Sequence, residues 1–230
     1  MKKIEVIVIA LISVFLLTGC VDKTTDAYKF KEEYESINNK DNGHGKKYRE
    51  LNIPNDNPFV YSTAEEVVKK LDKEETFVVY FGFKECPWCR SILEELIHAA
   101  KDKKVDKIYY VDIKDIRDVK EIDEQGNVVT TKEGNKAYME LLQRFDNVLS
   151  DYNLSNGLVE INSVEKRIYA PNIIAVSKGK AIQMEEGVSK ELTDPYSKLT
   201  KKMKKYTYNI FKCLFKCLEE ESQTCKKDMC

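Results

Sequence analysis

Cys86 and Cys89, three positions apart, are the residues whose type and spacing point most directly to chemistry. They enclose Pro87 and Trp88. A thiolate on one cysteine of such a pair attacks a disulfide, and the second cysteine then resolves the mixed disulfide. A static disulfide or half of a zinc site would show the same spacing, but a zinc site needs a second ligand pair, and the next cysteine is Cys213. We therefore interpret Cys86 and Cys89 as a redox-active pair.

The segments on either side of the pair predict the geometry that makes one sulfur reactive. Thr76 to Phe83 is almost continuously β-branched and aromatic, which is typical of a strand buried on both faces. Arg90 to Lys101 has apolar residues at helical spacing. Cys86 should therefore lie at a helix N-terminus, where unpaired N–H groups and the helix dipole stabilise a thiolate. Pro87 suits the first helical turn, and Cys89, one turn on, is the expected resolving cysteine.

The rest of the chain predicts an α/β domain around these two elements. A short strand and a helix capped by Ser62 or Thr63 come first, and a further strand follows the amphipathic helix, as in parallel sheets. Residues 114–134 predict an insertion or small hairpin, and residues 150–166 are ambiguous. The other expected elements are strands at 59–61, 107–113, 168–176 (interrupted at Ala170-Pro171) and 181–184, a turn at 177–180, and helices at 136–149 and 195–218.

The N-terminus reads as a secretion and anchoring segment. A cationic start precedes an apolar run from Ile4 to Leu17, which is shorter than the roughly 20 residues of a membrane-spanning helix. The run ends in Leu17-Thr18-Gly19-Cys20, which resembles a bacterial lipobox. We expect residues 1–19 to be a signal peptide and Cys20 to carry acyl chains such as palmitate, which would hold the chain on the outer face of the membrane. The alternative is an uncleaved anchor with a chance cysteine. Both place the domain outside the cytoplasm.

Composition limits the remaining possibilities. The chain has 230 residues, 38 Lys and Arg against 39 Asp and Glu, and 42% hydrophobic residues, enough for one sizeable core. The balanced charge argues against a nucleic-acid partner, which needs a basic surplus. We divide the chain into a signal peptide (1–19), the lipidated cysteine with a flexible tether (20–57), one α/β domain (58–212) and a cysteine-rich tail (213–230). Part of residues 26–37 could form a turn or two of helix within the tether.

Four cysteines in the tail form a second set: Cys213, Cys217, Cys225 and Cys230. Outside the cytoplasm we expect them to form structural disulfides. Four cysteines allow three pairings, of which Cys217–Cys225 with Cys213–Cys230 would staple a helical hairpin. A four-thiolate zinc site, a second redox relay and free thiols are the alternatives. We expect no cofactor beyond the redox-active disulfide and no metal.

Residues 81–89, Phe-Gly-Phe-Lys-Glu-Cys-Pro-Trp-Cys, resemble the active-site segment of the thioredoxin superfamily. The resemblance extends over about residues 58–212 and implies a thioredoxin-like fold, with a central mixed sheet flanked by helices. It implies further that Pro171 is a cis-proline facing the cysteine pair, where Ala170 offers its backbone to the substrate. Pro87 and Trp88 complete the expected substrate-binding set. A trans proline at the start of a strand is the alternative for Pro171.

Two departures from the family pattern concern the residues around the pair. Glu85 stands where typical thioredoxins have tryptophan, and the Pro-Trp dipeptide is more similar to glutaredoxin-like and disulfide-oxidant members. Many thioredoxins also carry a buried acid six residues before the first cysteine, which relays a proton for the resolving thiol. Tyr80 occupies that position. The relay is therefore expected to be absent or to be supplied by Glu75 or Glu85.

The resulting functional hypothesis is a membrane-anchored, extracytoplasmic thiol–disulfide oxidoreductase. It is similar to thioredoxin-like lipoproteins of Gram-positive bacteria, which include bacteriocin-transport accessory proteins. Its expected partners are protein thiols or disulfides as substrates and a membrane or extracellular redox partner, with the membrane reached through the lipid anchor. The direction of exchange stays open. The alternative is a non-catalytic binding module for an export or immunity system.

Overall fold

The structure is a computed structural model that describes residues 22–155 and 160–219. Its centre is β2, which is buried along its whole length because it consists of apolar residues on both faces. β2 pairs in parallel with β3 and antiparallel with β8, so the five-stranded sheet is mixed. The strands, in spatial order, are β1 (Phe59–Tyr61), β3 (Ile108–Asp112), β2 (Phe77–Gly82), β8 (Asn172–Ser177) and β9 (Lys180–Glu185).

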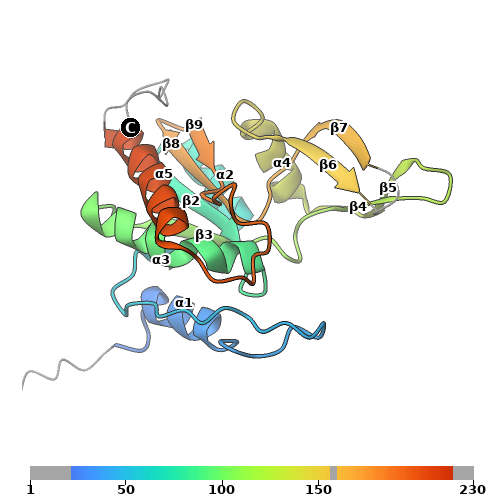
Figure 1. Ribbon diagram of the computed structural model, residues 1–230. Coiled ribbons are helices and arrows are strands. Elements are labelled where there is room, and N and C mark those ends of the chain that lie inside the picture. Colours follow the sequence, from blue (N-terminus) through green and yellow to red (C-terminus); the bar gives the residue numbers. More distant parts are fainter. Residues whose placement is uncertain (1–21, 156–159, 220–230) are drawn as a thin grey trace, which may run out of the picture.

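Helices cover both faces of this sheet (Figure 1). One face packs against α1 (Asp26–Glu35), α3 (Pro87–Asp102) and α5 (Lys201–Glu219). The other face packs against α2 (Ala64–Asp72) and α4 (Lys136–Arg144). Because successive residues of a strand point to opposite faces, Val78 and Tyr80 contribute to the first core and Val79 and Phe81 to the second. The protein is therefore an α/β protein with a mixed central sheet flanked by helices.

Local sequence explains where the helices begin. Thr63 caps α2 with a reciprocal capping box, because its side chain accepts from the backbone N–H of Glu66 at 3.2 Å while the Glu66 carboxylate accepts from the N–H of Thr63 at 2.9 Å. Cys86 is the N-cap of α3, and Pro87 lies in the first turn. The hairpin turn predicted at residues 177–180 joins β8 to β9. Its central residues, Lys178 and Gly179, both have positive φ, of 50° and 73°.

Residues 26–57, which the sequence analysis assigned to a flexible tether, are instead part of the folded body. Phe30 and Tyr34 of α1 are fully buried, and the ring of Phe30 stacks on that of Phe59 in β1 with centroids 3.9 Å apart. Leu51 and Ile53 are also buried in the same core. The domain boundary predicted at residue 58 is therefore wrong, because these scattered apolar side chains cover an edge of the sheet.

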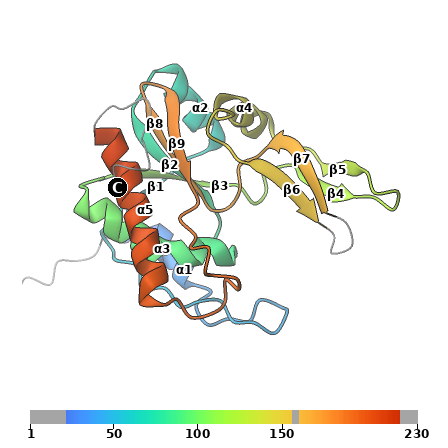
Figure 2. The same cartoon turned by 45° about the horizontal axis from the view of Figure 1, so that its top comes forward.

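Two hairpins extend together away from the sheet (Figure 2). The first, β4 (Val119–Ile122) with β5 (Val128–Lys132), confirms the hairpin expected within residues 114–134. The second, β6 (Asp151–Ser155) with β7 (Glu160–Lys166), occupies the region that the sequence left ambiguous. A buried ion pair between Arg167 and Asp118 joins the bases of the two hairpins.

The ends of the chain bear on the anchoring and disulfide predictions. Cys20, with residues 1–19, lies outside the described residues, so the lipid anchor stays a prediction. Within residues 22–155 and 160–219, no helix combines the length and apolar character needed to cross a bilayer. Cys213 and Cys217 in α5 are both disulfide-bonded, while Cys225 and Cys230 lie outside the described residues. The pairing of the four tail cysteines stays a prediction.

Candidate functional site

Cys86 occupies the N-cap of α3, directly after β2 and a short loop. Its backbone is extended (φ −69°, ψ 111°), which turns the side chain back over the first helical turn. There its Sγ accepts a hydrogen bond from the backbone N–H of Cys89 at 3.2 Å. That N–H has no intrahelical partner, so the sulfur supplies the missing acceptor at the positive end of the helix dipole. This is the position that the sequence predicted for a reactive thiol.

The loop before β8 brings a second polar group to the same sulfur. The antiparallel register of β2 and β8 pairs Phe81 with Asn172, so the residues just before β8 face the start of α3. The Ala170–Pro171 peptide bond is cis. The Cys86 thiol lies 3.2 Å from the Ala170 carbonyl oxygen, to which it can donate. Ala170 and Pro171, predicted as substrate-binding residues, therefore lie beside the cysteine pair.

The surroundings of Cys86 favour its thiolate, although the residue is only 4% exposed. Burial raises the pKa of the thiol, but hydrogen bonds from the Cys89 side chain and from the backbone N–H groups of Cys89 and Trp88 lower it, as does the positive charge of Arg117. The net effect is a pKa below the ordinary value of 9.0. Arg117 comes from the insertion after β3, and nothing in its sequence context marked it as part of this site.

Cys89 has the opposite character. It is completely buried, and burial raises the pKa of its thiol well above the ordinary value, with the Cys86 sulfur adding to the rise through a hydrogen bond and through charge. One sulfur therefore favours the thiolate while its neighbour holds its proton. For disulfide exchange, Cys86 is suited to attack, and Cys89 can attack only after its proton has left.

Tyr80 is the residue at the position where the relay acid was expected, and it lies in the same buried core as Cys89, where it lowers the pKa of the Cys89 thiol against the larger effect of burial. Glu75 pairs with Lys70 at 3.0 Å, and Glu85 pairs at 3.2 Å with Lys114, which follows β3. Tyr80 lies in β2 on the face that packs against α3, and it is fully buried. Its position six residues before Cys86 was the available indication.

A cavity of about 400 Å³ lies beside the pair. Three of the four predicted substrate-binding residues line it, namely Trp88, Ala170 and Pro171; Pro87 is not among them. The lining also includes residues between 186 and 192, a segment that no sequence pattern singled out. Glu186 is in this segment, and burial, with a smaller effect of the neighbouring carboxylate, raises its pKa. The cavity can accommodate a peptide side chain next to Cys86.

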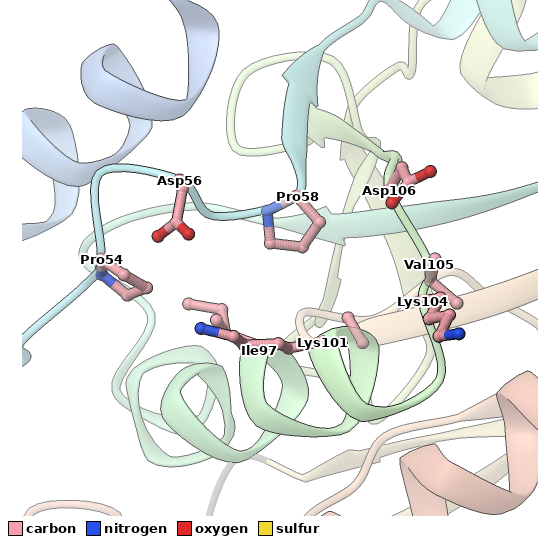
Figure 3. Close-up of a pocket in the computed structure, with 9 residues that line it drawn as sticks. Pro54, Asp56, Pro58, Ile97, Lys101, Lys104, Val105 and Asp106 are labelled. Carbon is pink, nitrogen blue, oxygen red and sulfur yellow. The ribbon is translucent and has the colours of Figure 1, made fainter. Parts of the chain in front are cut away.

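A second cavity, of about 270 Å³, is separate from this site. It lies between the segment containing Pro54, Asp56 and Pro58 and the C-terminal half of α3, with Ile97 and Lys101 on its floor (Figure 3). The cysteines are at the other end of α3, a helix of 16 residues that spans about 24 Å. This cavity therefore takes no part in the thiol chemistry.

Comparison with known proteins adds no assignment, because no family model and no curated protein matches the chain. Across the described ranges, 22–155 and 160–219, no three His, Cys, Asp or Glu side chains are grouped to hold a metal ion.

Proposed function

We propose that this chain is a thiol–disulfide oxidoreductase with a thioredoxin-like fold. The observation that carries the proposal is the asymmetry of the two sulfurs: Cys86 is held at the helix N-terminus, with its pKa lowered, against a fully buried Cys89 with its pKa raised. The fold assignment is supported by a mixed sheet in which the cysteine pair follows β2 and the cis peptide bond before Pro171 precedes the antiparallel β8. Perturbed thiols beside a cavity are typical of catalytic sites.

The geometry accounts for both steps of the exchange. The Cys86 thiolate attacks a substrate disulfide, so that one S–S bond breaks, a mixed disulfide forms and the first substrate sulfur leaves as a thiolate. Cys89 then loses its proton and attacks the Cys86 sulfur, which closes the Cys86–Cys89 disulfide and releases the second substrate sulfur. Two electrons pass from the cysteine pair to the substrate. The reverse sequence oxidises a substrate dithiol, and the relative potentials of the two pairs decide the direction.

The proposal includes the setting of the reaction. Acylation of Cys20 would tether the domain to the outer face of a bacterial membrane, which is an environment where protein disulfides persist. The substrates would then be extracytoplasmic protein thiols or disulfides, with a membrane or extracellular partner that restores the cysteine pair. Radiolabelled palmitate incorporated by the wild type, and lost in Cys20→Ala, would support this setting; equal labelling of both would contradict it.

Substitution of each cysteine in turn tests the reaction. Cys86→Ser should abolish insulin reduction and form no mixed disulfide, whereas Cys89→Ser should complete the first attack and accumulate mixed disulfides. Insulin reduction retained in Cys86→Ser would refute the proposal. A reduction potential below about −300 mV would also count against it, because such a pair behaves as an inert structural bridge and the domain would then be a binding module.

A further inference from the structure

The segment that follows β3 lies against the loop that leads into Cys86. At the end of β2, the Gly82 carbonyl oxygen accepts a hydrogen bond from the backbone N–H of Ile113 at 3.3 Å. One residue further on, the Lys114 ammonium pairs with the Glu85 carboxylate at 3.2 Å. These contacts fix the start of the insertion beside the cysteine pair.

Arg117 brings a positive charge from this segment to Cys86. Its guanidinium lies over the ring of Phe83, 5.4 Å from the ring centroid, and is attracted by the negative face of the ring. Phe83 is itself tied to the site, because its carbonyl oxygen accepts from the Cys86 backbone N–H at 3.1 Å. The charge reaches the sulfur, since it lowers the pKa of the Cys86 thiol.

Arg117 has no anionic partner within the part of the chain that the structure describes. In residues 22–155 and 160–219, no hydrogen bond or ion pair occupies its guanidinium, which is half-buried. The neighbouring lysines differ, because Glu85 neutralises Lys114 and the charge of Lys84 acts on Glu33. A guanidinium has N–H donors and no acceptor, so Arg117 is available to bind an anion next to the nucleophile.

We propose that Arg117 is a specificity-determining residue that binds a carboxylate of the substrate, so that the protein prefers disulfides flanked by acidic residues. The inference rests on the proposed disulfide exchange. An arginine and a carboxylate form charge-assisted, bidentate hydrogen bonds. The side chains next to a substrate cysteine lie close to its sulfur, so an aspartate or glutamate there reaches the guanidinium while Cys86 attacks. The exchange itself is unchanged: one S–S bond forms at Cys86, the substrate S–S bond breaks, and the leaving sulfur keeps the electron pair.

The position of Arg117 is separate from the cavity beside the pair. Arg117 does not line that cavity, which instead has both an acidic and a basic residue in its lining, Glu186 and Lys190. A substrate side chain in the cavity therefore meets groups of both signs, whereas a side chain at Arg117 meets a positive charge. The acidic preference belongs to the substrate residue on the Arg117 side of the sulfur.

Three symmetrical disulfides of similar length measure this preference. Dithiodipropionate is anionic, bis(hydroxyethyl) disulfide is neutral and cystamine is cationic. In Cys89→Ser the reaction stops at the mixed disulfide, so stopped-flow loss of thiolate absorbance gives the rate constant for attack by Cys86. Each rate constant is divided by the thiolate fraction, which removes the effect of charge on the thiol pKa. It is also divided by the rate constant of N-acetylcysteine amide, a neutral thiol, which removes the intrinsic reactivity of each disulfide.

The normalised rate constant should be higher for dithiodipropionate than for cystamine. Adding Arg117→Gln should lower the ratio of the two by about tenfold, because the variant loses an attraction and a repulsion that each contribute a few-fold at a partly exposed site. The rate with the neutral disulfide should change by less than about twofold. Arg117→Lys should keep most of the preference. Arg144→Gln is the matched control, because it removes the same charge from exposed ion pairs in α4, and it should leave the ratio unchanged.

Peptides extend the test to the proposed substrate class. An equimolar mixture of disulfide peptides with glutamate, glutamine or lysine next to the cysteine is offered to Cys89→Ser, and the captured peptides are identified by mass spectrometry. Glutamate peptides should be enriched over lysine peptides. The enrichment should disappear when Arg117→Gln is added, and equal enrichment in the two proteins would contradict the role of Arg117.

The outcomes separate this role from the proposed function. If Cys89→Ser reacted with none of the three disulfides, Cys86 would not be a nucleophile, and the proposed function and the role of Arg117 would both fail. If the neutral disulfide reacted but Arg117→Gln left the ratio unchanged, the role of Arg117 alone would be refuted. A salt titration of Cys89→Ser decides the matter if Arg117→Gln does not fold. The preference should fade as the screening length drops to about 3 Å at 1 M salt, and a ratio that is unaffected by salt would refute the role.

Discussion

Replacing Arg90 by methionine should loosen the N-terminal segment from α3. Arg90 is 1% exposed, and its guanidinium donates to backbone and amide oxygens of that segment. It reaches the Tyr34 carbonyl at 2.8 Å, the Arg49 carbonyl at 2.5 and 3.0 Å, and the Asn38 side chain at 2.5 Å. Tyr34 is in the last turn of α1, where carbonyl groups lack helical partners and a cation is favoured. Arg90 therefore binds the C-terminal turn of α1, and it also holds residues 34–49 against α3.

The expected magnitude follows from the groups that lose a donor. In Arg90→Met the carbonyls of Tyr34 and Arg49 lose their charged donor, at about 1–3 kcal/mol each. Methionine fills most of the space and needs no desolvated charge, which offsets part of this loss. We expect the free energy of unfolding to fall by about 3 kcal/mol.

Urea unfolding monitored by circular dichroism measures this loss, and limited proteolysis locates it. Cleavage within residues 26–57 should become faster while the rest of the domain stays protected. Arg144→Met is the control, because Arg144 forms exposed ion pairs with Asp72 and Glu140 and its loss should change stability by less than about 1 kcal/mol. A loss in Arg90→Met no larger than that in Arg144→Met would refute the reasoning.

Three further substitutions test other parts of the structure. Gly187 has φ of +70°, and a Cβ there would overlap with the Phe211 ring, so Gly187→Ala should lower the free energy of unfolding by about 1–3 kcal/mol in a urea titration; unchanged stability would contradict the packing of α5. Arg167→Met leaves the Asp118 carboxylate buried without its partner, so it should lower the free energy of unfolding by about 3–5 kcal/mol in the same urea titration. Unchanged stability would contradict a buried ion pair. Burial raises the pKa of Glu33 in the folded state, so the folded protein binds this proton more tightly than the unfolded chain and loses stability as the pH rises from 4.5 through the raised pKa. In urea unfolding measured across this pH range, Glu33→Gln should lose less stability than the wild type. An equal loss of stability in the two proteins would contradict the burial of Glu33.

The elements around the cysteine pair could be predicted from the sequence because local pattern and tertiary packing agree there. The apolar run Thr76–Phe83 contains β2, and the amphipathic stretch from Arg90 to Lys101 lies within α3. Cys86 lies at the start of α3 because only a short loop separates it from the end of β2 and because Pro87, which follows it, suits the first turn of a helix.

The N-terminal segment shows where this reasoning stops. The apolar spacing within residues 26–37 predicted a turn or two of helix, and α1 confirms it, but the charged and amide residues around it favoured a tether, so the burial of Phe30 and Tyr34 was not predicted. What holds the segment is Arg90, an arginine within an apolar helix face, together with an edge of the sheet that needs cover. Neither partner can be identified from local composition, because both contacts join residues far apart in the chain.

The position of Tyr80, but not its contacts, could be predicted from the sequence. It stands six residues before Cys86, where the family pattern has a buried acid, and a tyrosine there led to the expectation that the relay is absent or is supplied by Glu75 or Glu85. The hydroxyl oxygen of Tyr80 lies 3.1 Å from that of Tyr34 in α1, so its contacts depend on how the helices pack across the sheet. Arg117 is similar, because its effect on Cys86 depends on the path of an insertion.

The most direct test of the central claim is the pH dependence of alkylation at Cys86 in the reduced protein, with the modified residue identified by mass spectrometry. Burial alone would raise the pKa of this thiol, but the hydrogen bonds from Cys89 and from the start of α3 outweigh burial. We expect the alkylation rate to titrate below the ordinary value of 9.0. A Cys86 thiol that titrates at or above that value would contradict the assignment of Cys86 as the attacking nucleophile.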